Sequence, residues 1–202
     1  LPAAEKLLTE QTRILALCHI SNSLGTINPV KELIAKAKAA GTTTLVDGAQ
    51  GAPHLCADVQ ELDCDFYALS GHKTYGPTGI GVLYGRQEIL EAMPPYQVGG
   101  DMIRRVSFEK TTYKGIPERF EAGTPNIAGA VGLAAAIQYL AQFDPADIHA
   151  HETEVLEYAL DRIADIDGVT LYTKATNRIG VASFNLDGVH AHDIATILDR
   201  EG

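Results

Sequence analysis

Short apolar runs of strand type alternate with a helical segment in the first part of this chain, and this alternation restricts the fold more than any other sequence feature. ILALCHI at 14–20 and TTTLVD at 42–47 are apolar or β-branched, as buried strands are. Between them, VKELIAKAKAA places Leu33, Ile34 and Ala37 on one face, which predicts a helix packed against a sheet. A strand–helix–strand order of this kind predicts an α/β fold.

The ends of the helix and two further strands can also be predicted. Asn28 can cap the helix, Pro29 can occupy its first turn, and Gly41 can end it. DFYALS, ending at Ser70, and GIGVLYG at 79–85 predict strands, and the turn-rich GHKTYGPT between them favours an antiparallel or looped return. We therefore expect an α/β sheet with one antiparallel or looped return.

The second half predicts a different organisation. Residues 94–125 are rich in Gly, Pro and charge, which predicts a loop-dominated segment of functional or interface type. A buried helix over NIAGAVGLAAAIQYLAQF and an amphipathic one over ADIHAHETEVLEYALDRIADI should follow. VTLYT, RIGVASFNL and AHDIATILDR then predict a strand–strand–helix order. We therefore assign residues 1–143 to the central part of a large domain, and residues 144–202 to a connecting helix and an incomplete, smaller α+β C-terminal domain.

Composition excludes several classes of protein. A chain of 202 residues with 46% hydrophobic and 21% charged residues can bury a core. The formal net charge of -10 opposes nucleic-acid binding, which needs clustered Lys and Arg. No apolar run is long enough to cross a bilayer, and the first residues do not resemble a signal peptide, so we expect no membrane segment and a cytoplasmic location. Both ends of the sequence look cut.

No metal site is predicted. Cys18, Cys56 and Cys64 fall in no CxxC spacing, so we expect neither a disulfide framework nor a zinc site, and we interpret all three as buried, inert thiols. Other residues that could bind a metal are interpreted as solvated acids (Asp58, Asp63, Asp65) or as solvated or satisfied histidines (His19, His54, His149, His151, His190, His192).

Polar side chains gather at or just beyond the carboxyl ends of predicted strands, where open α/β sheets bind ligands. Asp47 and Gln50 follow one strand, and Ser70, His72 and Lys73 follow the next. Lys73 stands in a short loop before a rigid Tyr-Gly-Pro turn, which suits a Schiff base with a carbonyl compound. The amine must lose its proton to react, which burial or a neighbouring cation would favour. His72 could be that neighbour or could bind phosphate.

Asp47 ends an apolar strand, where a carboxylate is costly to desolvate unless a cation faces it. A protonated pyridine nitrogen is one such cation, and the pairing strengthens the ring's pull on electrons in enzymes that use pyridoxal phosphate (PLP). Asp47 and Lys73 are therefore a candidate pair for PLP. The alternatives are a turn carboxylate for Asp47 and a surface lysine for Lys73.

Four segments taken together are more specific: SNSLGTINPVKEL, LVDGAQGAPH, DCDFYALSGHKTYGPTGIGVLYG and RFEAGTPN. In this order and spacing they resemble the cysteine desulfurases and selenocysteine lyases of the SUF-system type, which are fold-type I PLP enzymes of the class V aminotransferase superfamily. The resemblance covers nearly the whole chain. It implies the large domain of an aspartate aminotransferase-like fold, with a mostly parallel sheet.

The resemblance also implies roles around the cofactor ring. Lys73 would carry PLP as a Schiff base, and Asp47 would pair with the pyridine nitrogen. Asn22 and Gln50 would hydrogen-bond the side of the ring that bears the phenolic oxygen. Read without the resemblance, Asn22 and Gln50 could be ordinary turn residues.

Other roles concern the phosphate. Ser70 and His72 would bind the phosphate of the same subunit. Thr124 would reach the phosphate of the other subunit, which implies a homodimer with residues 94–125 as its arm. Thr124 also precedes a proline and could simply start a helix, and His72 could be structural.

The implied activity is the removal of sulfur from L-cysteine, giving alanine and a persulfide for iron–sulfur cluster assembly, with a sulfur-acceptor protein as partner. In the family, the ring-stacking histidine lies upstream of this chain, and the sulfur-accepting cysteine and the carboxylate-binding arginine lie downstream. We assign none of these roles to Cys18, Cys56, Cys64 or Arg178.

Alternative functions remain open. L-selenocysteine could be the substrate of a selenocysteine lyase, and a PLP epimerase is a near relative. A nicotinamide-dependent oxidoreductase would fit the α/β order, but the chain has no GxGxxG after a strand. A non-catalytic remnant of the fold is the third alternative.

Overall fold

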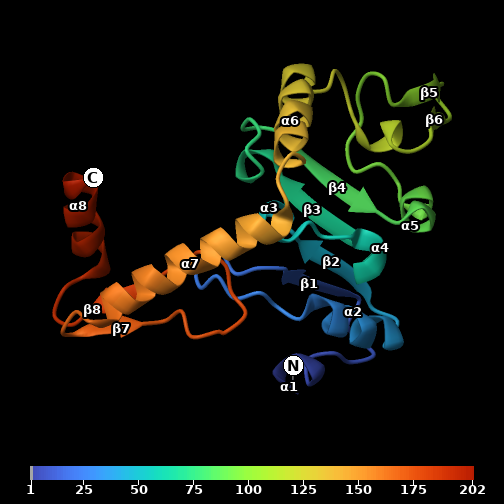
Figure 1. The fold of residues 1–202 in the computed structure, drawn as a ribbon. Helices are drawn as coiled ribbons and strands as arrows, with labels where there is room; N and C mark the ends of the chain where they lie inside the picture. Colours follow the sequence, from blue (N-terminus) through green and yellow to red (C-terminus); the bar gives the residue numbers. More distant parts are fainter. Residues whose placement is uncertain (1) are drawn as a thin grey trace.

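The computed structural model describes residues 2–202, which form one central sheet, two small sheets and surrounding helices (Figure 1). The strands are β1 (Ile14–Cys18), β2 (Thr43–Asp47), β3 (Phe66–Ser70), β4 (Gly81–Gly85), β5 (Ile103–Val106), β6 (Thr111–Tyr113), β7 (Val169–Leu171) and β8 (Phe184–Leu186). The α-helices are α1 (Pro2–Glu5), α2 (Val30–Ala39), α3 (Gly51–Leu55), α4 (Val59–Leu62), α5 (Gln87–Ala92), α6 (Ile127–Leu140), α7 (Pro145–Ala164) and α8 (Ala191–Glu201). The 3-10 turns are η1 (Gly71–Lys73) and η2 (Glu118–Phe120).

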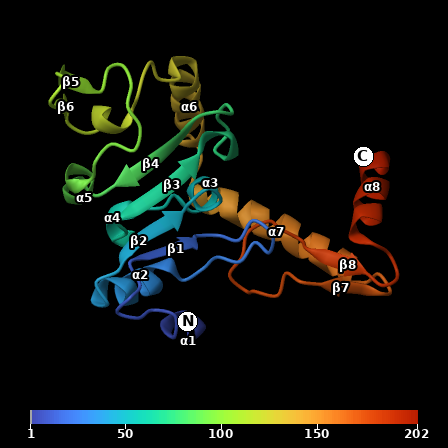
Figure 2. The same cartoon turned by 180° about the vertical axis from the view of Figure 1, so that it is seen from behind.

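The central sheet has the order β1-β2-β3-β4 (Figure 2). β1, β2 and β3 are parallel, with Cys18 opposite Asp47 and Asp47 opposite Ala68. β4 is antiparallel to β3, and Ser70 lies opposite Gly81. The mostly parallel sheet that the family resemblance implies is therefore confirmed, and the return from β3, expected to be antiparallel or looped, is antiparallel.

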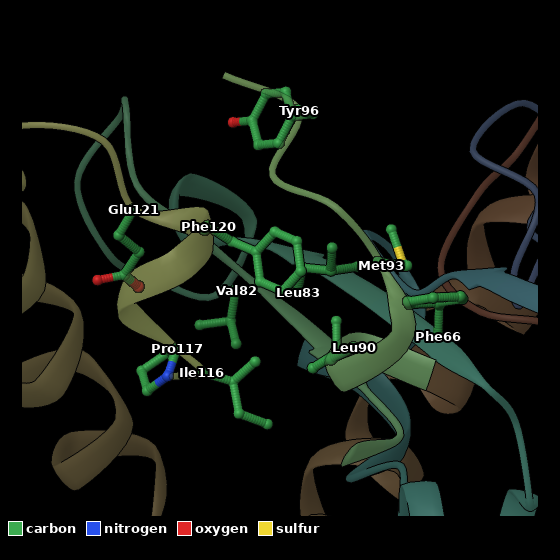
Figure 3. Close-up of a pocket in the computed structure, with 11 residues that line it drawn as sticks. Phe66, Val82, Leu83, Leu90, Met93, Tyr96, Ile116, Pro117, Phe120 and Glu121 are labelled. Carbon is green, nitrogen blue, oxygen red and sulfur yellow. The ribbon is translucent and has the colours of Figure 1, made fainter. Parts of the chain in front are cut away.

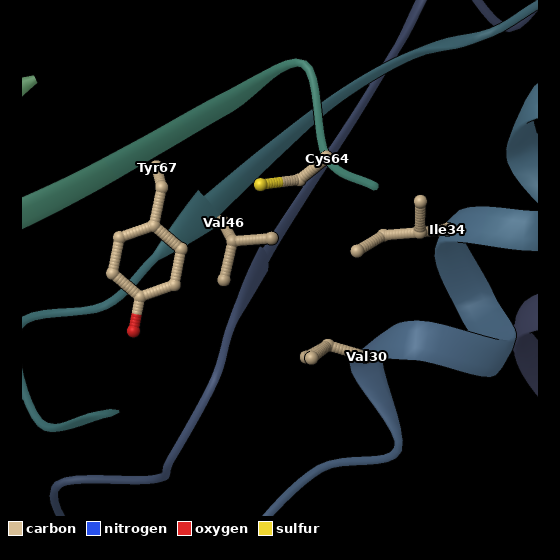
Figure 4. Packing of buried hydrophobic residues seen from close by; sticks show 5 residues of the cluster. All are labelled: Val30, Ile34, Val46, Cys64 and Tyr67. Carbon is tan, nitrogen blue, oxygen red and sulfur yellow. The ribbon is translucent and has the colours of Figure 1, made fainter. Parts of the chain in front are cut away.

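The main core lies between α2 and one face of the sheet. Val30 and Ile34 of α2 point toward Val46 of β2, and Cys64 and Tyr67 complete the cluster (Figure 4). Each of the five side chains is at most 3% exposed. Burial of this apolar area is the main favourable contribution to folding that these elements can make.

The apolar face of α2 agrees with its prediction, but the predicted cap is wrong. Ile34 and Ala37 are buried, and Leu33 is half-buried. The side chain of Asn28 does not cap the helix, because its amide donates to the carbonyl oxygen at the end of β1 at 2.9 Å. Pro29 is the N-cap residue, and no side chain caps this end.

Two segments that we predicted to be buried are partly exposed. β1 is an edge strand whose side chains alternate between exposed and half-buried, and Ile14 is 63% exposed. The buried residues of α6 are Gly129, Leu133 and Ala136, whereas Val131 is 66% exposed. Apolar composition cannot show whether a second layer covers the remaining side chains of a helix or strand.

The three acidic residues that we interpreted as solvated have structural partners. Asp65 is buried, and its carboxylate accepts hydrogen bonds from the backbone N–H of Thr44 at 2.7 Å and from the Thr44 hydroxyl at 2.9 Å. Arg86 Nε lies 3.3 Å from the same carboxylate, and Arg86 also pairs with the exposed Asp63. Asp58 caps α4. The interpretation of Asp65 as solvated was therefore wrong, since a buried carboxylate can be stable where donors and a cation surround it.

Residues 94–125 contain more regular structure than predicted. β5 and β6 form an antiparallel hairpin, and η2 follows it. The backbone N–H of Lys114 donates to the carbonyl oxygen of Met102 at 2.9 Å, and Met102 is fully buried. The hairpin was missed because its strands are short and carry charge.

The C-terminal part extends away from the central sheet along α7 (Figure 1). Asp144 caps α7 by accepting the backbone N–H of Ala146 at 2.8 Å, and Pro145 occupies the first turn. β7 and β8 pair antiparallel and α8 follows, as predicted. In residues 2–202 no single helix could cross a membrane by length and composition, although α6 and α7, bent by 83°, pass that test as a pair.

Candidate cofactor site

Six of the seven predicted site residues follow the carboxyl ends of β1, β2 and β3. The parallel register places Cys18 opposite Asp47 and Asp47 opposite Ala68, two residues before the end of β3, so the residues that follow these strands share one edge of the sheet. Residues from separate parts of the sequence are thus brought to one edge, as predicted. They are Asn22 after β1, Asp47 and Gln50 at and after β2, and Ser70, His72 and Lys73 at and after β3.

Lys73 is the last residue of η1 and is half-buried. The backbone N–H of Gly71 donates to the carbonyl oxygen of Ile80 at 2.9 Å, which closes the loop that follows β3. The hydroxyl of Thr74 donates to the carbonyl oxygen of Ser70 at 3.1 Å. These hydrogen bonds restrain the backbone from which the amine of Lys73 projects.

Ser70 and His72, three residues and one residue before Lys73, form a polar pair. Ser70 Oγ and His72 Nδ1 are 2.9 Å apart, with Ser70 half-buried and His72 exposed. A serine hydroxyl and an imidazole N–H are each able to donate a hydrogen bond to an anionic oxygen. The geometry is therefore suitable for a phosphate group.

Asp47 is exposed, which differs from the expectation of a carboxylate that is costly to desolvate. Its Oδ1 accepts the backbone N–H of Ala49 at 2.9 Å. Within residues 2–202, no Lys, Arg or His lies at ion-pair distance from this carboxylate. The carboxylate can therefore accept a hydrogen bond from a cationic group that is not part of the described chain.

Thr124 is exposed on the segment that precedes α6. Two residues later, the side chain of Asn126 accepts the backbone N–H of Gly129 at 2.9 Å and donates to the carbonyl oxygen of Gly79 at 3.1 Å. This links the start of α6 to the loop that follows Lys73. No hydrogen bond within the described part of the chain joins Thr124 to the other six residues, and its contact with a second subunit stays a prediction.

A buried pair behind this edge was not singled out from the sequence. His19 follows β1, is 6% exposed, and has its Nδ1 3.1 Å from the hydroxyl of Tyr67. A Cβ on Gly48 would lie 1.9 Å from the Tyr67 ring, so the chain after Asp47 can pass the ring only without a side chain at this position. The small-residue run GAQGAP was the available signal.

The His19–Tyr67 pair is electrostatically neutral. Burial lowers the pKa of His19 below its ordinary value of 6.5. Burial also raises the pKa of Tyr67 above its ordinary range, with smaller contributions from Cys64 and Asp47. His19 and Tyr67 therefore form a neutral, hydrogen-bonded pair in the interior next to the exposed carboxylate of Asp47.

We expect His19 to make the chain less stable in acid. Because the folded-state pKa is lower than the unfolded-state pKa, the unfolded chain takes up a proton first as the pH falls below about 6.5. The contribution to stability is complete above that pH and is lost below it, with a slope of at most about 1.4 kcal/mol per pH unit. Urea unfolding between pH 5 and 8 should show a smaller pH dependence for His19→Asn than for wild type.

The matched control for this experiment is His149→Asn, since His149 is exposed on α7. It should keep the pH dependence of the wild-type chain. An unchanged pH dependence in His19→Asn would contradict the assignment to His19.

The cysteines differ from their prediction. Cys64 is buried, and burial raises the pKa of its thiol. Cys18 and Cys56 are exposed, because β1 is an edge strand and Cys56 follows the last turn of α3. The interpretation of all three as buried thiols was therefore wrong for two of them.

A cavity of about 600 Å³ lies away from the candidate site (Figure 3). Apolar side chains of β4, α5 and the segment around η2 line it, including Leu83, Leu90, Met93, Ile116 and Phe120. None of the seven candidate residues contributes to its wall. The cavity therefore offers no group for the chemistry predicted here.

The candidate site combines three chemical functions at one edge. The amine of Lys73 can react with an aldehyde, and the carboxylate of Asp47 can pair with a ring nitrogen that carries a proton. Ser70 and His72 can bind a phosphate. A phosphorylated heterocyclic aldehyde requires these three functions, so the residues fit PLP.

Comparisons with known proteins agree with this chemistry. The family described as Aminotransferase class-V matches residues 1–202. A probable cysteine desulfurase of Halalkalibacterium halodurans is 52% identical over 198 residues, covering 98% of this chain and 48% of the relative. The chain thus spans about half the length of the curated relatives that it matches.

Solved structures of cysteine desulfurases and of C-DES are also similar to this chain. The cysteine desulfurase CsdA of Escherichia coli superposes with a TM-score of 0.94 at 44% identity, covering 100% of this chain and 51% of that protein. A C-DES variant with glycine covalently linked to PLP has a TM-score of 0.86 at 26% identity, covering 99% and 54%. C-DES is also described as a cystine C-S lyase in complex with its product, cysteine persulfide, at 28% identity and a TM-score of 0.84, covering 98% and 55%.

Proposed function

Because this chain belongs to the class V aminotransferase family, we propose that it is the central part of a PLP-dependent cysteine desulfurase. The observation that supports this most is the shared sheet edge that carries Lys73, Asp47 and the Ser70–His72 pair. Relatives named cysteine desulfurase at about 50% identity support the choice among the enzymes of this family.

Lys73 and Asp47 hold the two reactive parts of the cofactor in this proposal. Lys73 would hold PLP through its amine, and the Asp47 carboxylate would accept a hydrogen bond from the protonated pyridine nitrogen. Asn22 and Gln50 hydrogen-bond the side of the ring that bears the phenolic oxygen. The exposure of Asp47 is consistent with this role, since a bound ring would supply the cation that the described chain lacks.

Ser70 and His72 bind the phosphate in the same subunit. Thr124 contributes from the other subunit of a homodimer, with residues 94–125 as the arm. The link from Asn126 to Gly79 supports this, because it ties the start of α6 to the loop that follows Lys73.

The substrate in this proposal is L-cysteine. PLP, when bound, supplies a sink for the electrons of the substrate α-carbon. Lys73 would hold the cofactor through its amine and, when that amine is free, would take the proton from the substrate α-carbon as general base. A cysteine thiolate, which the family resemblance places outside the present sequence, takes the sulfur as a persulfide and leaves alanine.

The proposal also includes a partner protein and a cellular location. The persulfide sulfur passes to an acceptor protein for iron–sulfur cluster assembly, and the enzyme acts in the cytoplasm. L-Selenocysteine is the alternative substrate, because both amino acids present the same groups to the site. C-DES, described as a lyase of cystine, is only 28% identical, so desulfuration is the better-supported activity.

The proposal is tested by titrating the purified chain with PLP, reducing the adduct with borohydride and mapping it by mass spectrometry. A single stoichiometric adduct on Lys73 is expected. Adducts spread over several lysines, or no adduct, would contradict a specific PLP site in this chain.

A further inference from the structure

Two segments that are far apart in the sequence lie side by side next to the candidate site (Figures 1 and 2). The Asn22 loop, residues 21–27, follows β1, and residues 177–183, which we call the anchor segment, lie between β7 and β8. Thr26 and Arg178 form an isolated antiparallel bridge. The C-terminal part of the chain thus touches the loop that carries a candidate cofactor ligand.

Hydrogen bonds join the two segments along their length. The backbone N–H of Ile27 donates to the carbonyl oxygen of Asn177 at 3.1 Å, and that of Ile179 donates to the carbonyl oxygen of Gly25 at 2.9 Å. The hydroxyl of Ser183 donates to the carbonyl oxygen of Ser23. Three hydrogen bonds, one donated by the Asn22 loop and two by the anchor segment, therefore fix the relative position of the two segments.

The anchor segment is itself held by α7. The side chain of Arg178 is 15% exposed, and its guanidinium group donates to the carboxylate of Glu157 on α7 at 2.6 Å and to the carbonyl oxygen of Ala175 at 2.7 Å. The next residue, Ile179, is 4% exposed. A charged side chain this well enclosed and paired restrains the backbone that carries it.

Gly25 makes the close approach possible. Its φ is +69°, and a Cβ at this position would lie 2.8 Å from the carbonyl oxygen of Ile179 and 3.1 Å from the Cβ of Val181. A side chain would therefore need both an unfavourable backbone conformation and a displacement of the anchor segment. Only glycine fits here without a shift.

We propose that the anchor segment holds the Asn22 loop in place and so positions Asn22 at the sheet edge. Two backbone hydrogen bonds close the turn inside the loop. The N–H of Gly25 donates to the carbonyl oxygen of Ser21 at 2.9 Å, and the N–H of Ser21 donates to the carbonyl oxygen of Thr26 at 2.9 Å. Asn22 lies inside this turn. Within residues 2–202, neither its backbone nor its side chain makes a hydrogen bond of its own, so its position depends on the residues of the turn around it. Gly25 and the anchor segment act as positioning groups. The effect of this positioning on PLP binding rests on the function proposed above.

The chain offers a closely matched control for Gly25→Ala. Gly41 has a φ of +70°, but a Cβ there would have nothing within 4 Å. Gly25→Ala and Gly41→Ala therefore carry the same backbone penalty, and only Gly25→Ala adds the contact with Ile179.

The first measurement is hydrogen–deuterium exchange on the unliganded chain. Exchange in residues 21–27 should become roughly tenfold faster in Gly25→Ala, as expected for a steric conflict in a packed site, and should stay near wild type in Gly41→Ala. Equal exchange in the two variants would overturn the proposal. Because this measurement needs no cofactor, it decides the positioning claim even if wild type forms no adduct on Lys73 and the proposed function fails.

The second measurement is PLP binding, followed by the pH midpoint of the visible absorption of the adduct. Loss of the Asn22 hydrogen bond to the phenolic oxygen should weaken binding severalfold and move the midpoint to higher pH in Gly25→Ala relative to Gly41→Ala, because the donor favours the deprotonated form. A loosened loop with unchanged binding and midpoint would overturn the positioning of Asn22.

Ser183→Ala provides a milder variant if Gly25→Ala does not fold. It removes the hydroxyl that donates to Ser23, and Ser107→Ala, in the distant β5–β6 hairpin, is its control. Exchange in residues 21–27 should rise for Ser183→Ala only. The same exchange in both serine variants would overturn the proposal.

Discussion

Replacing Lys73 by alanine is expected to abolish the borohydride-reducible PLP adduct completely. The Schiff base needs a primary amine at this point of the sheet edge, and Lys73 is the lysine that η1 presents there. The measurement is the visible absorption of PLP-loaded protein, followed by reduction and intact mass. The folded structure should be unaffected, because no hydrogen bond or ion pair of the Lys73 side chain is present in residues 2–202.

Lys31→Ala is the control for this variant. Lys31 is exposed on α2 and pairs with Glu61 at 2.8 Å rather than with a candidate site residue, so its loss should leave the adduct unchanged. A full adduct in Lys73→Ala would overturn the assignment of this lysine, whereas loss in both variants would point to a general effect on folding.

Truncating Ile34 to alanine should cause a large loss of stability. Ile34 is 1% exposed and packs in the main core between α2 and the sheet (Figure 4). Removing a buried side chain of this size costs about 2–5 kcal/mol, through lost transfer free energy and the cavity left behind. Urea unfolding followed by circular dichroism measures the difference in the free energy of unfolding.

Ile197→Ala is the matched substitution, since Ile197 is also in a helix but is 55% exposed. Its effect should be within about 0.5 kcal/mol, the usual range for surface substitutions. Similar losses for the two variants would contradict the position of the core between α2 and the sheet.

Much of the candidate site could be predicted because its signals are local. A run of apolar residues that ends in Asp47, and another that ends in Ser70, place polar groups at strand ends, and parallel pairing brings those ends together. The glycine-rich loop around Lys73 was likewise recognisable, and the structure shows it closed by its own backbone hydrogen bonds.

Other features depended on partners that are distant in the sequence. The exposure of Val131 depends on which elements cover α6, and the burial of Asp65 depends on Thr44 and Arg86. His19 gave no signal by itself, because its role depends on the hydroxyl of Tyr67, 48 residues away. Composition and periodicity do not identify such pairs.

The sequence by itself determined where the four strands of the central sheet lie along the chain and which residues stand at or after their carboxyl ends, because both depend on patterns within a few residues. Only the tertiary structure decided that Asp47 is exposed, that His19 is buried, and that the anchor segment meets the Asn22 loop. The physical reason is that burial and close approach are properties of the surfaces that meet when the chain folds. Gly25 shows this: its positive φ is local, but the need for glycine there comes from a carbonyl group 154 residues further along the chain.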